Sequence, residues 1–192
     1  MKLAFFDDFH LGIVNGESIT DITGVLAAAP AKSPQDLLVE LITRFAELRS
    51  AIEREASQGR SVPLSSVRLR PPAPKPGNVV CMAVNYMEDG TLKERPLINA
   101  FQKVPGSIIG PKDTMVLPDA PATTFEGEAE IALVIGKRAS HVPAAKAMDH
   151  VFGYVNFIDG SARGLPPAGN TFYQMKSRDT FAPIGPWIVT AD

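Results

Sequence analysis

Three glutamates at alternate positions are the residues of this sequence best placed to do chemistry. The stretch FEGEAEIALVIG, residues 125–136, carries Glu126, Glu128 and Glu130 directly before an apolar run. Side chains of a β-strand alternate between its faces, so a strand here brings the three carboxylates onto one face. We expect its second half to be buried on both faces. Adjacent carboxylates raise each other's pKa unless a cation neutralises them, so the pattern indicates either a solvated acidic face or a cation site.

A further carboxylate closes another apolar run. The segment VFGYVNFIDGSAR, residues 151–163, is apolar as far as Asp159, and we expect Arg163 to lie in the turn that follows. An acid at the end of a strand is often only a turn residue. Two strands that both end in carboxylates can, however, gather three oxygen ligands, which suit Mg²⁺, Mn²⁺ or Ca²⁺ better than Zn²⁺. Lys176 precedes the next apolar strand, where a lysine is ordinarily a solvated surface charge.

The elements that position these residues begin with a small mixed segment. Residues 3–25 are typical of short strands around an NGE turn at 15–17. One helix is predicted from Pro34, which follows the N-cap residue Ser33, to the terminating Gly59, because apolar residues recur at helical spacing. The proline-rich stretch LRPPAPKPGN can form neither a helix nor a central strand, so it is interpreted as a connector.

The connector suggests a division into a small α+β domain, residues 1–70, and a β-rich domain, residues 71–192. In the second part, short β-type runs alternate with turns rich in proline and glycine, and only residues 143–151 are typical of a short helix. The pattern predicts a mostly β (α+β) fold with a mixed β-roll or sandwich. The sequence stops directly after a predicted core strand, so we expect either that this strand is an edge or that the second domain is incomplete at its C-terminus.

Composition excludes several classes of function. The 192 residues are 45% apolar and 21% charged, with a formal net charge of −2, which does not indicate a nucleic-acid or anionic-membrane partner. No apolar run approaches the ~18 residues of a membrane span, and the N-terminus lacks the apolar region of a signal peptide. A single cysteine, Cys81, fits a reducing compartment and is interpreted as a buried structural thiol rather than a nucleophile. We therefore expect a cytoplasmic protein.

The order of several segments resembles the fumarylacetoacetate hydrolase family over residues 79–190. These segments are VVCMAVNY, SIIGPKDTMVLP, EAEIALVIGK, HVFGYVNFIDGSAR and MKSRDTFAPIGPWIV. They are similar to bacterial 2-hydroxyhepta-diene-dioate isomerase and 2-keto-4-pentenoate hydratase members, and the first 70 residues resemble the small domain that many bacterial members carry. The resemblance implies a β-rich roll of the family's C-terminal type and a homodimer. It also implies Mg²⁺ or Mn²⁺, with Ca²⁺ as a substitute in crystals.

The resemblance also implies roles for particular residues. The family's Glu-x-Glu motif places two metal ligands at Glu128 and Glu130, and its aspartate ligand matches Asp159. Lys176 matches the active-site lysine, which contributes a positive charge or a proton to an oxyanion. Arg163 matches the arginine of the SAR segment, which binds substrate charge or fixes local structure. Glu126 falls outside the motif.

The implied activity is metal-dependent chemistry on a 2-oxo or 1,3-dicarbonyl acid, as in aromatic compound catabolism. A chelated metal stabilises the enolate formed in hydrolysis, decarboxylation, isomerisation or hydration. The alternatives are a degenerate member that binds metal or a small acid without turnover, and a β-rich interaction module with a solvated acidic face.

One departure from the family concerns the stretch NYMEDGTLKE, where hydrolytic members carry a water-activating histidine. Here Glu88 or Asp89 occupies that position, so both are candidate bases, and Tyr86 is a candidate substrate contact. The absent histidine counts somewhat against hydrolysis. Residues 87–104 mix charges with turn residues and are interpreted as either a mobile lid or an ordinary surface loop.

Overall fold

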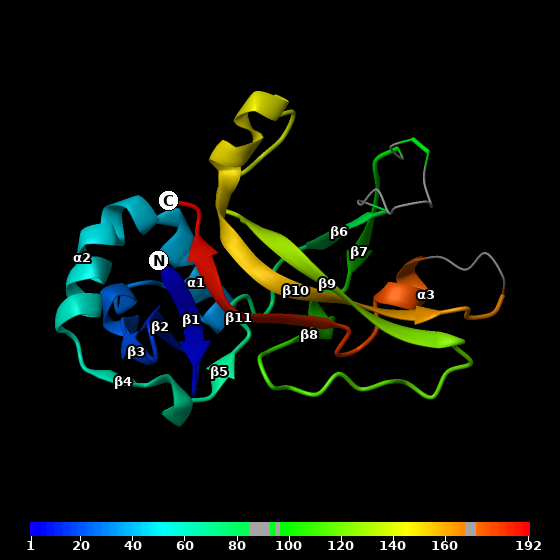
Figure 1. Cartoon of the computed structure of the whole chain (residues 1–192). Coiled ribbons are helices and arrows are strands. Elements are labelled where there is room, and N and C mark those ends of the chain that lie inside the picture. Colours follow the sequence, from blue (N-terminus) through cyan, green and yellow to red (C-terminus); the bar gives the residue numbers. More distant parts are fainter. Residues whose placement is uncertain (85–92, 95–96, 168–171) are drawn as a thin grey trace.

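The computed structural model describes residues 1–84, 93–94, 97–167 and 172–192 (Figure 1). Its main sheet has the strand order β4-β3-β2-β1-β11-β10-β9, with β5 beside β1 and β8 beside β11. The strands are β1 (Lys2–Phe6), β2 (His10–Asn15), β3 (Ser18–Asp21), β4 (Ser61–Pro63), β5 (Leu69–Arg70), β6 (Val79–Ala83), β7 (Asn99–Lys103), β8 (Ile108–Ile109), β9 (Thr124–Ile135), β10 (Val151–Arg163) and β11 (Ala182–Thr190). The expected mostly β fold with additional helices is therefore observed.

Three α-helices and four short 3₁₀ segments complete the described part of the chain. They are α1 (Pro34–Thr43), α2 (Phe45–Gln58), α3 (Phe172–Lys176), η1 (Thr23–Leu26), η2 (Leu64–Ser66), η3 (Pro105–Ser107) and η4 (Ala144–His150). The short helix predicted over 143–151 is thus the 3₁₀ segment η4. Helices α1 and α2 lie at the end of the sheet formed by the N-terminal strands, whereas α3 lies near the opposite end of β10 (Figure 1).

The single helix predicted from Ser33 to Gly59 is two helices, so this prediction was wrong in its middle. The start is as predicted, because the Ser33 hydroxyl accepts a hydrogen bond from the backbone of Asp36. Arg44 has φ −106° and ψ 12°, which is not helical, and separates α1 from α2. Leu41 of α1 and Ile52 of α2 are both fully buried in one core, so the break allows both apolar faces to reach it.

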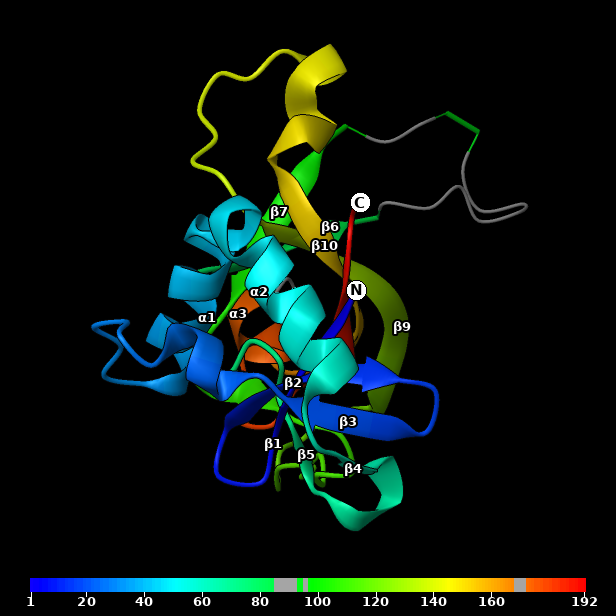
Figure 2. The same ribbon diagram turned by 90° about the vertical axis from the view of Figure 1, so that its left-hand side faces the viewer.

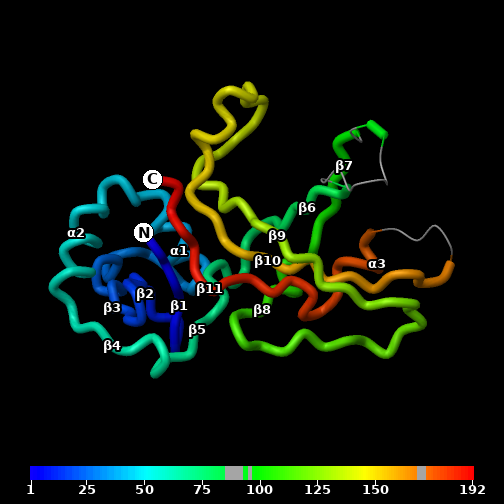
Figure 3. Tube along the Cα trace, viewed as in Figure 1, coloured from blue at the N-terminus to red at the C-terminus, as the bar shows by residue number. Residues whose placement is uncertain are grey.

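The N- and C-terminal strands pair with each other. β1 is antiparallel to β11, with Leu3 opposite Ile188, and the backbone N–H of Thr190 donates to the carbonyl of Met1. The tube trace shows both ends of the chain running side by side (Figure 3). One sheet therefore continues across the predicted boundary at residue 70, and the division into two domains stays a prediction. β11 lies between β1 and β10, so it is not the edge strand considered above.

The longest strand pair, β9 and β10, forms the curved arm that carries the acidic residues (Figure 2). Pairing runs from Val151 opposite Ile135 to Arg163 opposite Thr124. Arg163 therefore lies within β10, not in a turn after Asp159 as predicted, because the pairing with β9 continues past the acid.

The two faces of β9 differ in burial, and the expectation that its second half is buried on both faces was wrong. Ile131, Leu133 and Ile135 are 70%, 50% and 57% exposed. Ala132 and Val134, on the same face as the glutamates, pack against the main core instead. Among the described residues, only the inner face of β9, which carries the glutamates, packs against the core, so the side chains of its outer face stay exposed.

A separate two-stranded sheet faces this inner side. β6 and β7 are antiparallel, with Cys81 opposite Phe101, and α3 packs against both β7 and β10. Residues 99–103 of the predicted loop or lid are therefore strand β7, while residues 87–92 and 95–96 of that segment lie outside the described residues. The sheet places side chains of β6 and β7 opposite the acids of β9 and β10.

Candidate active site

Asp159 of β10 is the centre of a buried group of charges. Its side chain is 2% exposed, and it lies opposite Glu128 of β9 in the strand register. Lys103 Nζ donates to Asp159 Oδ1 at 2.5 Å, and Lys176 Nζ donates to Asp159 Oδ2 at 2.5 Å. Because burying a carboxylate without partners is strongly unfavourable, the contacts with these two ammonium groups offset the cost of placing Asp159 inside the fold.

Lys176, from α3, connects two of the acids. Its side chain is 3% exposed, and its Nζ also lies 3.0 Å and 3.1 Å from the two carboxylate oxygens of Glu128. The ring of Phe101, whose centroid is 5.3 Å from Nζ, covers another side of the ammonium. The lysine is therefore a buried cation held by two carboxylates and an aromatic ring, and not the solvated surface charge of the simpler interpretation.

Lys103, from β7, was missed by the sequence analysis. It is fully buried, and besides Asp159 it donates to the backbone carbonyl of Gly160 at 2.9 Å. Burial lowers its pKa below the ordinary value, and the adjacent Asp159 opposes that shift. The segment was interpreted as either a mobile lid or a surface loop, and the local sequence NAFQK does not indicate that its lysine is buried.

Glu130 of β9 reaches towards Asp159 from the neighbouring strand. Burial raises the pKa of Glu130, and the nearby Asp159 and Glu128 add to the rise. It makes no ion pair or hydrogen bond that joins it to another described residue. Two adjacent carboxylates, one of them without a cation partner, match the arrangement that a bound cation stabilises.

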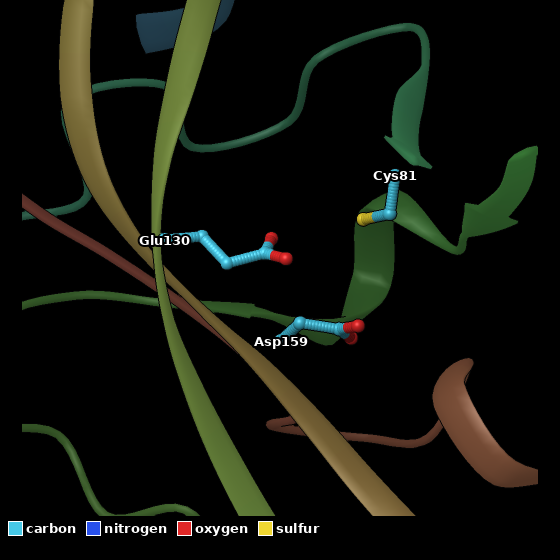
Figure 4. Close-up of side chains that lie close together, drawn as sticks. All are labelled: Cys81, Glu130 and Asp159. Atoms are coloured by element: carbon cyan, nitrogen blue, oxygen red, sulfur yellow. The ribbon is translucent and has the colours of Figure 1, made fainter. Parts of the chain in front are cut away.

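Cys81 of β6 completes the group on the opposite side. One ligand atom from each of Cys81, Glu130 and Asp159 lies within 4.8 Å of the others (Figure 4). The thiol is 6% exposed, and burial, followed by the charge of Asp159, raises its pKa to about 12. The expectation that Cys81 is a buried thiol is therefore confirmed, although charged side chains surround it.

Glu128 is held by a different set of contacts. Arg163 donates to Glu128 through Nη2 and to Glu126 Oε2 through Nε, the latter at 2.7 Å, and the Ser161 hydroxyl donates to Glu128 at 3.1 Å. Burial alone would raise the pKa of Glu128, but the contacts with Lys176 and Arg163 outweigh it and lower the pKa. Glu126 thus pairs with Arg163 at the rim of the site.

The structure brings most of the predicted site residues into one neighbourhood. Those gathered at the inner faces of β9, β10 and α3 are Glu128, Glu130, Asp159, Arg163 and Lys176. Glu128 is not part of the closest carboxylate and thiol group, because its oxygens face Lys176 and Arg163. Tyr86, Glu88 and Asp89 lie outside the described residues. The roles assigned to all eight stay predictions.

The arrangement has the chemistry of a site for a hard divalent cation. Carboxylate oxygens are the preferred ligands of Mg²⁺ and Mn²⁺, and the carboxylate of Glu130 beside Asp159 offers such a donor. Asp159 accepts hydrogen bonds from two ammonium groups, but each carboxylate oxygen has a second lone pair for a metal. The residues present therefore fit a divalent cation.

The fold is that of the family which the sequence resembles. Residues 78–192 match the model of the fumarylacetoacetate (FAA) hydrolase C-terminal family, and the chain belongs to this family. A maleylpyruvate hydrolase from Aquipseudomonas alcaligenes is 30% identical over 208 residues, which cover 100% of this chain and 71% of that protein.

Two further relatives illustrate the range of the family. The crystal structure of maleylpyruvate hydrolase from Sphingobium sp. SYK-6, in complex with manganese(II) ion and pyruvate, has a TM-score of 0.85 and 38% identity, covering 100% of this chain and 68% of that chain. A mitochondrial oxaloacetate tautomerase from Homo sapiens is 34% identical over 190 residues, 95% of this chain and 59% of that protein.

These comparisons confirm the expected family, the mostly β fold of its C-terminal type and the general class of enzyme. The relatives are named as a hydrolase and a tautomerase, so the reaction within the class differs between them. Among the described residues, no helix combines the length and the apolar character needed to cross a membrane.

Proposed function

We propose that this chain acts on a 2-oxo or 1,3-dicarbonyl acid through a metal-stabilised enolate. The observation that carries the proposal is the gathering of three carboxylates: Glu128 and Asp159 both hold the buried ammonium of Lys176, and Glu130 lies beside Asp159. The relative from Sphingobium supports it, because its structure contains manganese(II) together with pyruvate, a 2-oxo acid.

In this proposal Glu128, Glu130 and Asp159 hold Mg²⁺ or Mn²⁺, with Ca²⁺ able to replace them in crystals. When bound, the cation supplies a Lewis acid for the keto and carboxylate oxygens of the substrate. Glu130 is the ligand most accessible to a cation, because it makes no ion pair with another described residue. To bind the cation, Glu128 and Asp159 would give up part of their contact with the Lys176 ammonium.

Lys176 is the proposed catalytic cation. Its ammonium is fixed by Asp159 and Glu128 and shielded on one side by Phe101, so little reorganisation is needed when negative charge develops on a substrate oxygen. It stabilises that oxyanion or donates a proton to it. Arg163, 39% exposed at the rim, binds the carboxylate of the acid.

The proton-transfer group is proposed to come from the stretch after the first strand of the β-rich part. Glu88 or Asp89 acts as the base in place of the family histidine, and Tyr86 contacts the substrate. A carboxylate base suits enol–keto isomerisation, where it moves one proton, at least as well as hydrolysis, where it must also activate water. We therefore propose isomerisation or tautomerisation as the first reaction to test, with hydrolysis, decarboxylation and hydration as the alternatives.

The remaining proposals concern the setting of the enzyme. We propose a cytoplasmic homodimer with a small domain over residues 1–70 and a catalytic domain over residues 71–192, without a nucleic-acid or membrane partner. The net charge of −2 supports the last point, since a binder of anionic surfaces is usually basic. Size-exclusion chromatography with light scattering tests the dimer.

The decisive experiment is calorimetric titration of oxalate, a mimic of a 2-oxo acid enolate, with and without Mg²⁺ or Mn²⁺. We expect oxalate binding only when metal is present, and we expect Glu128→Gln and Lys176→Met to weaken it. Asp149→Asn, at an exposed pair with Lys146, is the matched control and should change nothing. Oxalate binding that does not depend on metal would contradict the proposal.

Turnover is then measured on oxaloacetate and acylpyruvates, with chelator as the negative control. We expect metal-dependent turnover that Glu128→Gln abolishes. Metal-dependent oxalate binding without turnover on the whole panel would identify the alternative, a family member that binds metal or a small acid without catalysis. Two features favour this second candidate: the absent histidine, and the stretch FIDGSARG, where Ile158 and Gly164 replace polar residues of the family's usual NDVSARD.

A further inference from the structure

Cys81 lies in an unusual environment for the only cysteine of the chain. Along β6, Val80 and Met82 face outward and are 64% and 42% exposed, while Cys81 between them faces inward and is 6% exposed. An inward thiol ordinarily packs among apolar side chains. Cys81 does belong to the main apolar core, but on its other side it lies near the charges of Asp159 and Glu130 and of the two buried lysines.

The thiol points into the carboxylates. In the close-up, Glu130 extends from β9 towards the space between Cys81 and Asp159 (Figure 4). One ligand atom from each of the three residues lies within 4.8 Å of the others, and the Cys81 thiol makes no disulfide. A buried sulfur and two carboxylates that converge from three strands form a compact set of metal ligands.

We propose that Cys81, Glu130 and Asp159 bind thiophilic divalent cations such as Zn²⁺ or Cd²⁺, in addition to the hard cation of the proposed function. This inference rests on the proposed function, because it places a second ligand set at the same centre. On binding, the hydrated cation gives up the waters that the sulfur and the two carboxylates replace, the Cys81 thiol loses its proton to the buffer, and one metal–sulfur bond and two metal–oxygen bonds form. No oxidation or reduction takes place.

The distances support this ligand set. Zinc–sulfur bonds of about 2.3 Å and zinc–oxygen bonds of about 2.0–2.2 Å place tetrahedral ligand atoms about 3.4–3.6 Å apart. The three ligand atoms lie within 4.8 Å of one another. Rotation of the side chains therefore needs to bring them closer by about 1 Å, and the strands need not move. A fourth position remains for water or a substrate oxygen.

The chemistry of the donors separates the two sets. Mg²⁺ and Mn²⁺ prefer oxygen and use Glu128, whereas Zn²⁺ and Cd²⁺ prefer sulfur when it is available. Glu128 is already held by Lys176, Arg163 and Ser161, so a thiophilic cation gains more from Cys81 than from displacing those contacts. Glu130 and Asp159 are common to both sets. Zn²⁺ or Cd²⁺ therefore competes with the hard cation and inhibits the enzyme.

The test uses the full chain and follows ultraviolet absorption during titration with Cd²⁺, or with Co²⁺ as a spectroscopic substitute for Zn²⁺. Because the chain has a single cysteine, a thiolate-to-metal charge-transfer band reports Cys81 alone. We expect this band in the wild type, its loss in Cys81→Ser and Cys81→Ala, and at least a tenfold weaker Cd²⁺ affinity in both variants. Mn²⁺ affinity, measured by calorimetry, should change less than threefold.

Two carboxylate variants distinguish a built site from a lone thiol. Glu130→Gln and Asp159→Asn should each weaken Cd²⁺ binding at least about tenfold, because each removes a direct ligand and even the loss of an outer-shell partner commonly costs about 10–100-fold. Glu128→Gln should weaken Mn²⁺ more than Cd²⁺. Folding of each variant is checked by circular dichroism, and the serine and alanine variants provide two independent replacements of Cys81.

The outcomes separate this inference from the proposed function. Mn²⁺ binding without a thiolate band in the wild type would overturn the thiophilic site and leave the proposed function intact. A thiolate band without any Mn²⁺ binding would support the thiophilic site and count against the proposed function. A band whose Cd²⁺ affinity is unchanged in Glu130→Gln and Asp159→Asn would show a lone reactive thiol and overturn the inference.

Discussion

Replacing Lys103 with methionine removes one of the two ammonium groups that contact Asp159, and the consequence can be worked out from the structure. The pair is almost completely buried, with side chains 0% and 2% exposed and Nζ 2.5 Å from Oδ1. Breaking such a pair leaves an uncompensated buried charge and typically costs about 3–5 kcal/mol. Lys176 still contacts Oδ2, so we expect the lower end, about 3 kcal/mol. For a chain of this size that corresponds to a fall in Tm of roughly 6–12 °C.

The assay is thermal and urea unfolding in the presence of chelator, which prevents a metal from compensating Asp159. Lys146→Met is the matched control, because Lys146 pairs with Asp149 at 3.7 Å with both side chains largely exposed. An exposed pair contributes about 0–1 kcal/mol, so the control should unfold within about 4 °C of the wild type.

The double variant Lys103→Met/Asp159→Asn completes a thermodynamic cycle. Removing both charges avoids the unpaired carboxylate, so we expect the double variant to lose less stability than the sum of the single variants, by about 1–3 kcal/mol. If Lys103→Met unfolded like Lys146→Met, or if the two single changes were additive, the buried charge pair would not be a determinant of this fold and the reasoning would be refuted.

Three further outcomes follow from other residues of the site. The pKa of Glu130 is raised above its ordinary 4.5, so its contribution to stability should grow as pH falls through that raised pKa and be complete below 4.5; in chelator, the Tm of the wild type relative to Glu130→Gln should therefore rise over that window. Gly160→Ala would place a Cβ 2.9 Å from the Phe181 carbonyl oxygen, so it should lower the free energy of unfolding in urea by about 1–3 kcal/mol. The control Gly24→Ala, whose Cβ would have no atom within 4 Å, should lower it by less than about 1 kcal/mol. In Arg163→Lys, a single ammonium replaces the Nε and Nη2 donors of the guanidinium. The variant should raise KM for a 2-oxo acid about tenfold, with a smaller change in kcat. An unchanged KM would show that Arg163 does not bind the substrate.

Several features were decided by short-range patterns, and for these the sequence was sufficient. The alternation of Glu126, Glu128 and Glu130 predicted a strand with one acidic face, because a strand has a side-chain period of two whatever surrounds it. Ser33 before a proline predicted the start of α1, since a cap requires only neighbouring residues. The family match rested on the order of such local segments.

Other features depend on which segments meet in space, and these required the tertiary structure. Lys103 and Cys81 lie on β7 and β6 and become site residues only because that sheet packs opposite β9 and β10. The exposure of Ile131 depends on whether another part of the chain packs over its face of β9, and the break at Arg44 depends on two helical faces sharing one core. Burial, charge pairing and metal geometry arise from contacts between residues far apart in the chain, and a local pattern does not contain them.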